Sequence, residues 1–329
     1  MQKAHFIWFL FILAAALGVI SFTTQVEAQL QWEMPEVQFP ADNPFSEESI
    51  TLGNALFGEQ LFSEDTTISC QSCHMPHMGM TDQLKVGEGV FRRPVTRNTP
   101  TLLNIGLHPY FMKDGKFASL EDQVLGPIKN HREFNMDEDE LLMRLKSLPY
   151  LDELSQDAYG ADLTIDIIQK SLANLQRVLV SDDSPFDAYM LGNLEAISAS
   201  AKNGYQLFTS DKLNCTKCHS GFDFADYSFQ NNGTYAQYLD SGRAIVTKQT
   251  ADIGKFKVPT LRNLAVTFPY MHDGSFQTLK EVIHHYEQGG QTSSNKSPLI
   301  TGFTLIDEER EDLLAFLGSL TERRFLEEE

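Results

Sequence analysis

Two short strings of cysteine and histidine are the residues of this sequence whose types and spacing could do chemistry. They are Cys70-Gln-Ser-Cys73-His74 and Cys215-Thr-Lys-Cys218-His219, and they contain all four cysteines of the chain. In a Cys-x-x-Cys-His string the two sulfurs form thioether bonds to a porphyrin, and the histidine can bind the iron. A Cys-x-x-Cys pair is also typical of zinc sites and of thiol exchange, but the repeated histidine favours haem. The sequence therefore predicts two covalently attached haem c cofactors.

The ligand on the second face of each iron decides what such a haem does. When the protein fills both axial positions the haem carries electrons, and when one position is open a small molecule can react there. The residues that could reach the second axial positions are therefore the candidates for function.

The elements that must position the haems are mainly helical. Apolar residues recur at helical spacing in three stripes, which are typical of the buried faces of helices. The stripes are Ile168, Leu172, Leu175 and Leu179; Ile197, Ala201, Gly204 and Phe208; and Leu313, Phe316, Leu317 and Leu320. The segment at residues 181–185 interrupts the helical pattern and predicts a turn near a domain boundary.

Matching segments indicate an internal duplication. Residues 58–62 precede the first haem string much as residues 204–208 precede the second. Residues 100–104, followed by Asp114 and Phe117, match residues 259–263, followed by Asp273 and Phe276, at one constant separation. Two matches in one register favour two haem domains of common ancestry over a solenoid. We predict a first domain at residues 29–190 and a second at residues 191–329.

The first residues predict export from the cytoplasm. Lys3 precedes an apolar run from Phe6 to about Phe22, and Ala28 ends a small-residue pattern typical of signal cleavage. We predict a cleaved signal peptide at residues 1–28 and a periplasmic mature protein. The alternative is an uncleaved membrane anchor, because the run approaches the ~17 to 25 residues that span a bilayer.

The charge balance argues against nucleic acid as a partner. Asp and Glu number 45 against 26 Lys and Arg, which gives a formal net charge of −19. Such a surface repels phosphates, and it either serves solubility or steers a basic protein partner.

At this point the sequence resembles the bacterial di-haem cytochrome c peroxidase and MauG family, over residues 52–320. Besides the haem strings, the shared motifs are Arg97-Asn98-Thr-Pro-Thr101, Gly126-Pro127 followed by Glu133, Asp240-Ser-Gly-Arg243, Pro259-Thr-Leu-Arg-Asn263 and Phe268-Pro-Tyr-Met-His-Asp-Gly274. The resemblance implies a mainly α fold of two cytochrome-c-like domains, each with one haem. It also implies that hydrogen peroxide is reduced at the N-terminal haem, and that electrons enter through the C-terminal haem. His74 and His219 would be the proximal ligands of the first and second iron.

The resemblance assigns two catalytic residues near the first haem. Glu133 matches a distal acid, and peroxide cleavage needs a group that moves a proton from the inner to the outer oxygen. Gln123 matches a distal amide that could donate a hydrogen bond to peroxide. The alternatives are an ordinary surface charge at Glu133 and a solvent-facing amide at Gln123.

The chain departs from the family at the loop that caps the first iron. Many family members have a histidine there, in a Gly-His-Gly string, whereas this chain has Gly87-Glu88-Gly89. A carboxylate is a poor substitute for imidazole on haem iron, so we expect a first haem that is open without reductive activation. His77 is too close to the proximal string to reach the other face of the iron.

At the second haem, Tyr286 stands where other members supply either methionine or tyrosine. A phenolate stabilises ferric iron, so this haem should have a lower potential than one with histidine and methionine ligands. The alternatives are that His284, His285 or Met271 is the ligand, with Tyr286 in the core.

Two further expectations concern the space between the domains. Lys113 stands where family members have a tryptophan between the haems, so electron transfer between them must use another route. The resemblance also implies a structural calcium ion, with Asn98, Thr267 and Pro269 at the matching positions; oxygen ligands of this kind suit Ca²⁺.

The leading hypothesis is a di-haem cytochrome c peroxidase that takes electrons from a small cytochrome c or a cupredoxin. One alternative is a MauG-like oxidase that uses peroxide to oxidise a protein or organic substrate. Another is a di-haem electron carrier without catalytic activity. A homodimer is expected from the resemblance alone.

Overall fold

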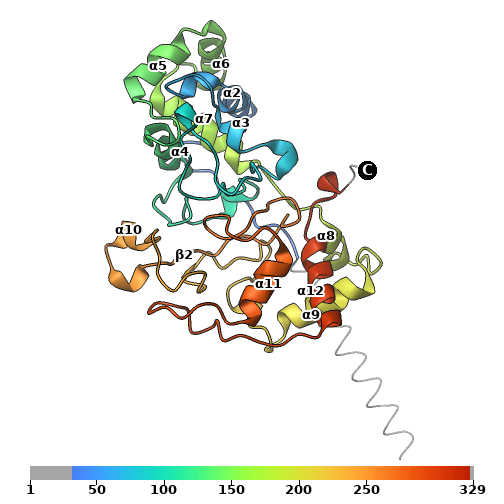
Figure 1. The fold of residues 1–329 in the computed structure, drawn as a ribbon. Helices are drawn as coiled ribbons and strands as arrows, with labels where there is room; N and C mark the ends of the chain where they lie inside the picture. The colour runs from blue at the N-terminus through green and yellow to red at the C-terminus, as the bar shows by residue number, and fades with distance from the viewer. Residues whose placement is uncertain (1–31, 327–329) are drawn as a thin grey trace, which may run out of the picture.

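The computed structural model describes residues 32–326, which form a mainly helical protein, as the apolar stripes predicted (Figure 1). The predicted signal peptide lies outside the described residues. Within residues 32–326, no helix combines the length and the apolar character that crossing a membrane requires. The named strands are β1 (Phe229–Gln230) and β2 (Phe256–Lys257), which pair antiparallel with Phe229 opposite Lys257.

The first hydrophobic core lies among helices of the N-terminal half, which occupy the upper part of Figure 1. Helix α2 (Glu47–Phe57) packs against α6 (Pro149–Tyr159) and α7 (Ile165–Arg177). Helix α4 (Leu120–Lys129) packs against α7, and α5 (Glu138–Lys146) against α6. The short helix α3 (Cys70–Cys73), which contains both cysteines of the first haem string, lies beside this core.

The second hydrophobic core lies among α8 (Pro185–Met190), α9 (Ala199–Thr209), α11 (Leu279–Glu287) and α12 (Asp307–Ser319). Helix α9 packs along α12, and α8 and α11 contact α12. Aromatic rings fill this core, and Phe186 of α8 is central among them. Helix α8 therefore packs with the second core, although the predicted boundary assigns its residues to the first domain.

The remaining elements are short. They are α3 (Cys70–Cys73), α10 (Ala244–Thr247) and the 3₁₀ helices Gln60–Phe62, Pro76–Met78, Val90–Arg92, Ile105–Leu107, Cys215–Lys217, Thr250–Asp252 and Arg323–Phe325.

Seven of the described helices begin where the sequence supplies a capping side chain, whereas α6 and α12 begin after Leu148 and Ile306 without one. In each of the seven a side-chain oxygen accepts a hydrogen bond from a free backbone N–H in the first turn. The capping residues are Ser46, Ser119, Asp137, Thr164, Ser184, Ser198 and Thr278.

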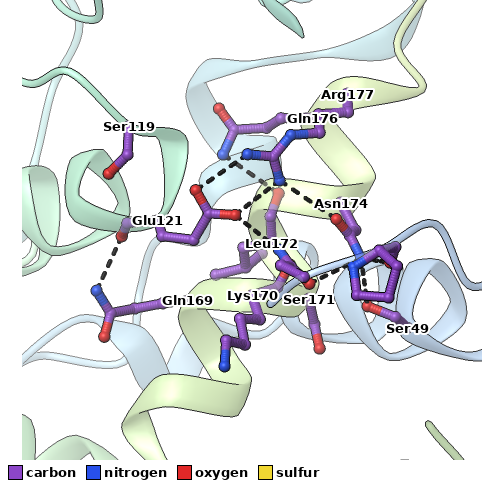
Figure 2. Close-up of polar contacts among 12 residues, drawn as sticks. Ser49, Ser119, Glu121, Gln169, Lys170, Ser171, Leu172, Asn174, Gln176 and Arg177 are labelled. Carbon is purple, nitrogen blue, oxygen red and sulfur yellow. Dashed lines mark hydrogen bonds and ion pairs between the residues drawn. The ribbon is translucent and has the colours of Figure 1, made fainter. Parts of the chain in front are cut away.

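A polar network ties three helices of the first domain together (Figure 2). Arg177 of α7 donates to both carboxylate oxygens of Glu121 on α4, at 2.7 and 3.0 Å. Arg177 also donates to Asn174, whose amide donates to Ser49 on α2 at 3.1 Å. Gln169 of α7 donates to the main-chain oxygen of Glu121 at 2.9 Å. The network fixes the orientation of α4, the helix that leads to the cavity described below.

In each half, one pair of helices is in close backbone contact at a glycine. A methyl group at Gly53 on α2 would lie 2.3 Å from the main-chain oxygen of Ser171 on α7. A methyl group at Gly204 on α9 would lie 1.9 Å from the main-chain oxygen of Asp312 on α12. Both contacts require the absence of a side chain, so the backbones of each pair approach closely for the same reason.

The repeated asparagines support the duplication. Asn104 and Asn263 both have left-handed backbone conformations, with φ of 58° and 62°. The side-chain oxygen of Asn104 accepts from the N–H of Ser181, just after α7, at 2.7 Å. That of Asn263 accepts from the N–H of Glu322, just after α12, at 2.9 Å. The two halves therefore share a local structure as well as a sequence pattern.

Replacing Gly204 by alanine should destabilise the second domain, because the new methyl group would collide with the main chain of Asp312. Overpacking of this kind costs about 1 to 3 kcal/mol of unfolding free energy. The matched control is Gly318→Ala on α12, since nothing lies within 4 Å of a methyl group there. Urea unfolding measures both variants. Equal stability of the Gly204→Ala variant and the wild type would contradict the close helix contact.

Candidate functional site

The first haem string forms a single helical turn that presents its histidine in one tautomer. The N–H of His74 donates to the main-chain oxygen of Cys70 at 3.0 Å and closes the turn. The ring atom Nδ1 lies 3.0 Å from the main-chain oxygen of Met80. Because a carbonyl only accepts, Nδ1 carries the hydrogen and the lone pair of Nε2 is left for a metal. Burial lowers the pKa of His74, which favours the neutral ligand form.

The second haem string has the same arrangement. The N–H of His219 donates to the main-chain oxygen of Cys215 at 2.9 Å. Its Nδ1 lies 2.9 Å from the main-chain oxygen of Phe224, so here too Nε2 is free to bind iron. Burial also lowers the pKa of His219.

The cysteines fit thioether bonds better than thiolate chemistry. Burial raises the pKa of Cys70, Cys73 and Cys215 to about 12, and it raises the pKa of Cys218. A zinc site needs thiolates, and residues 32–326 hold no group of three or more His, Cys, Asp or Glu that could bind a metal ion. Both strings therefore fit covalently bound haem, and neither is joined by the third ligand that a zinc site would need among these residues. Each of two bound haems would be held by the two sulfurs and the one Nε2 atom of its string.

A cavity of about 210 Å³ lies near the first string, and Glu133 lines it. Its other lining residues are Met112, Lys116, Phe117, Gly126, Lys129 and Asn130. The cavity has room for several water-sized molecules. The negative charge of Glu133 contributes to the raised pKa values of Cys70 and Cys73, which places the carboxylate close to the first haem string.

Glu133 is held by its own segment. The amide of Asn130 donates to a carboxylate oxygen of Glu133 at 2.6 Å, and the main-chain oxygen of Glu133 accepts from the N–H of Val90 at 2.8 Å. Burial raises the pKa of Glu133, while Asn130 and the nearby Lys116 oppose the rise. A carboxyl group with a raised pKa, fixed in orientation, is suited to exchange protons near neutral pH.

Gln123 reaches the cavity only through a neighbour. It lies on α4, half-buried, and its amide nitrogen is 3.7 Å from the sulfur of Met112, which lines the cavity. Gln123 thus contacts a residue that lines the cavity, whereas Glu133 lines the cavity itself.

The loop Gly87-Glu88-Gly89 packs against the Glu133 segment. A methyl group at Gly89 would lie 1.9 Å from the main-chain oxygen of Arg132, so the loop and the segment touch backbone to backbone. A methyl group at Gly87 would lie 3.8 Å from the sulfur of Cys73, so this end of the loop is close to the first haem string. The Glu88 side chain is exposed, and so is His77. These positions support the expectation that neither side chain caps the first iron.

The structure brings two of the sixth-ligand candidates for the second haem together. The amide nitrogen of Asn232 lies 3.2 Å from the sulfur of Met271 and 3.4 Å from the hydroxyl of Tyr286 on α11. Burial raises the pKa of Tyr286, and the nearby thiols Cys215 and Cys218 add to the rise, which places the phenol at the second haem string.

The two histidines beside Tyr286 are unsuited to the iron. His285 Nε2 lies 3.0 Å from the main-chain oxygen of Asn232 and therefore donates to it, and His284 is exposed. Asn232 itself was missed in the sequence because it lies in an irregular segment without a motif. Only the fold shows that it reaches both Met271 and Tyr286.

The contacts at the predicted calcium position do not fit a metal ion. The side-chain oxygen of Asn98 accepts from the ammonium group of Lys113 at 3.4 Å, and its amide donates to the main-chain oxygen of Leu84 at 3.0 Å. A divalent cation on Asn98 would have to displace this ammonium group. The position expected to hold tryptophan thus supplies an amine beside Asn98.

Ion pairs between shared motifs join the two halves. The guanidinium of Arg97 donates to both carboxylate oxygens of Asp240, at 2.6 and 2.9 Å, and to Asp114 at 2.8 Å. Arg243 donates to the main-chain oxygens of Asp114 and Gly115, at 2.9 and 2.7 Å. Bidentate pairs of this kind fix orientation, so these motifs dock the domains and do not line the cavity.

Comparison with known proteins agrees with this geometry. Residues 47–195 match the family model described as di-haem cytochrome c peroxidase. The chain is 38% identical to the methylamine utilization protein MauG of Methylorubrum extorquens, over 88% of this chain and 83% of that protein. It is 32% identical to the cytochrome-c peroxidase IdrP1 of a Pseudomonas species, over 88% of this chain and 84% of that protein.

A solved structure extends the likeness to the fold. The crystal structure of a MauG-like protein associated with microbial copper homeostasis superposes with a TM-score of 0.84 and 30% sequence identity. It covers 89% of this chain and 98% of that chain, so the predicted arrangement of two cytochrome-c-like domains is confirmed.

Replacing Glu133 by glutamine should lower peroxide turnover about 100-fold or more, because the amide cannot shuttle a proton. In the wild type, turnover should fall as the pH drops through the raised pKa of Glu133, at a higher pH than for an ordinary carboxyl group. The variant should lack this dependence. Steady-state rates between pH 4 and 8 measure both effects, with the exposed Glu88→Gln as the control. Unchanged turnover in the Glu133 variant would exclude the carboxyl group as the proton shuttle.

Chelation of calcium should leave the protein unchanged, because Lys113 already supplies a cation beside Asn98. We expect the same melting temperature and haem absorbance with and without EGTA, and no calcium by elemental analysis of dialysed protein. A loss of stability that added Ca²⁺ restores would reinstate the calcium site.

Proposed function

The chain belongs to the di-haem cytochrome c peroxidase and MauG family, and from that premise we propose that it is a peroxidase. In this proposal hydrogen peroxide is reduced to water at the first haem, and the electrons enter through the second. The reaction consumes two electrons and two protons for each peroxide and yields two molecules of water.

One observation carries the proposal, and it is a difference between the two haem strings. A cavity lined by Glu133 adjoins the first string, whereas Met271, Tyr286 and Asn232 crowd together at the second. A carboxyl group in a cavity is thus available for proton transfer near the first string, and an amide, a phenol and a thioether lie together at the second. This difference supports catalysis at the first haem and electron transfer at the second.

The residues of this chain do the proton chemistry. When bound, the first haem supplies an iron that accepts a peroxide oxygen and passes electrons to it. The Glu133 carboxylate takes the proton from the inner oxygen and returns it to the outer oxygen, which leaves as water. Asn130 holds the carboxylate in one orientation by its hydrogen bond, and Phe117 and Met112 keep the cavity wall apolar.

Tyr286 is proposed as the sixth ligand of the second haem. The amide of Asn232 lies within reach of its oxygen and would stabilise the phenolate form. Met271 lies beside the same amide and is the alternative ligand. A phenolate would give this haem a lower potential than a methionine would.

The remaining parts of the proposal concern the setting of the reaction. The electron donor is a small cytochrome c or a cupredoxin, and the protein works in the periplasm after removal of its signal peptide. A homodimer is proposed as the assembly. The net charge of −19 favours a donor with a basic docking surface.

A MauG-like oxidase is the second candidate. Tyr286 at the second string favours it, because MauG-like members also have tyrosine there. The exposed Glu88 favours it as well, because no histidine in the capping loop closes the first iron. Lys113 in place of the tryptophan counts against it.

Electron paramagnetic resonance of the ferric protein, together with steady-state assays, tests the proposal. We expect one high-spin centre that shifts on addition of cyanide, one low-spin centre that does not, and rapid oxidation of a reduced small cytochrome by peroxide. Negligible turnover with every small donor, despite a reactive high-spin centre, would favour the oxidase. Two low-spin centres whose spectra do not change with cyanide would contradict the proposal and favour a di-haem electron carrier without catalytic activity.

A further inference from the structure

A buried polar cluster at the boundary between the two domains has no part in the proposed function so far. We call it the interface cluster; it consists of Asn104 and His108 from the first half and Asp223, Tyr227, Lys257 and Thr260 from the second. It lies next to Lys113, the residue that replaces the expected tryptophan, because the N–H of Lys257 donates to the main-chain oxygen of Lys113 at 2.8 Å.

Asp223 is the centre of the interface cluster. One carboxylate oxygen accepts from the amide of Asn104 at 3.1 Å and from the hydroxyl of Thr260 at 3.0 Å. The other accepts from the hydroxyl of Tyr227 at 3.0 Å. Asp223 is 3% exposed, so these bonds replace the water it has lost. One buried carboxylate therefore joins side chains of both domains.

The ring of His108 contacts the phenol of Tyr227 in a tilted arrangement and joins it to the first domain. The two ring centroids are 4.6 Å apart. His108 Nε2 faces Asp223 at 3.4 Å, and the amine of Lys257 lies 2.8 Å from Nδ1. Burial and the positive charge of Lys257 lower the pKa of His108 to about 4, so the ring is neutral. Tyr227 is thus in contact with an aromatic ring of the other domain.

Chain neighbours of the interface cluster are hydrogen-bonded to the second haem string. Asp223 precedes Phe224, whose main-chain oxygen receives the hydrogen bond from His219. Tyr227 follows Asp226, whose N–H donates to the main-chain oxygen of Cys218 at 2.8 Å.

The loop from His108 leads from the interface cluster to the first site. Four residues after His108 comes Met112, which lines the cavity beside the first string. Phe111 and Phe117 form an isolated bridge across this loop, which holds it in one conformation. Tyr227 therefore lies between the second haem string and the loop that borders the reactive cavity.

We propose that Tyr227 is the electron relay between the two haem domains, with Asp223 as the acceptor of its proton. This inference rests on the proposed function, since oxidation by peroxide at the first site supplies the driving force. It answers the question that the missing tryptophan raises.

The step balances without a further reactant. Tyr227 gives one electron to the peroxide-oxidised first centre, its O–H bond breaks, and the proton moves to the carboxylate oxygen of Asp223. The products are a neutral tyrosyl radical and a protonated Asp223. One electron from the second haem and the same proton then restore the phenol. Because the proton moves along one hydrogen bond within the cluster, no charge has to be separated in a dry interface.

The other aromatic candidates fit the role less well. Trp32, the tryptophan of the described residues, donates to Asp187 and makes edge-on or tilted ring contacts with Phe186, Phe222 and Phe224, all in the second half. Tyr110 belongs to the interface but is 41% exposed, and no proton acceptor for its hydroxyl is found within residues 32–326.

The test is the Tyr227→Phe variant, which keeps the ring and its contact with His108 and loses only the hydroxyl group. Holoprotein with only the second haem reduced is mixed with one equivalent of hydrogen peroxide. The rate at which the second haem is reoxidised should fall about tenfold or more in the variant. Freeze-quenched ferric wild type treated with peroxide should show a radical signal that ring-deuterated tyrosine narrows, and the variant should lack it.

The matched control is Tyr110→Phe, which removes a tyrosine hydroxyl from the same interface and should change neither readout. A wild-type rate and an unchanged radical signal in the Tyr227→Phe variant would overturn the relay alone. If the wild-type haems do not respond to peroxide at all, both the relay and the proposed function are wrong.

Discussion

A hydrogen bond from a histidine ring to a main-chain carbonyl determines what both haem strings can do. Met80 supplies the carbonyl for His74 and Phe224 supplies it for His219. In each case the bond places the ring hydrogen on Nδ1, so the other nitrogen is free to bind iron, and burial keeps the ring neutral. Because the acceptor is a main-chain atom, the constraint survives changes in the side chains around it. The proximal sides of the two haems are therefore alike, and any difference in function has to arise on the opposite faces.

On those opposite faces the duplicated frame carries different side chains. Met112 and Met271 occupy equivalent positions, both with left-handed backbones at φ of 66° and 76°. Beside Met112 lies a cavity with a carboxyl group, whereas beside Met271 lie an amide and a phenol. The same loop can thus border a carboxyl group in one half and an amide and a phenol in the other. The substitutions that decide this lie outside the repeated motifs, on α11 and in the segment around Glu133.

Much of the fold and of the chemistry could be predicted from the sequence, because both depend on local patterns. The helices follow from apolar spacing, and the haem strings from five consecutive residues. What could not be predicted depends on contacts between distant segments. Asn232 has no motif, and only folding brings it to Tyr286. Helix α8 follows a predicted turn, yet Phe186 belongs to the second core because its ring meets Phe224 and Phe316 at centroid distances of 5.6 and 5.3 Å. The contact between Lys113 and Asn98 could not be predicted for the same reason, since it forms only in the folded chain.

The replacement of tryptophan by Lys113 is tolerated because the domains are docked by other groups. The pairs of Arg97 with Asp240 and Asp114, and the bonds from Arg243 to main-chain oxygens, hold the two halves in register without an aromatic ring between them. Docking and electron transfer therefore place separate demands on this interface. A side chain that serves only electron transfer can change, provided that an oxidisable group remains near both haem sites. Tyr227 satisfies that condition from the other side of the boundary, where a carboxylate already holds its hydrogen bond. The interface could thus lose one aromatic relay and use another without any change in the way the domains dock.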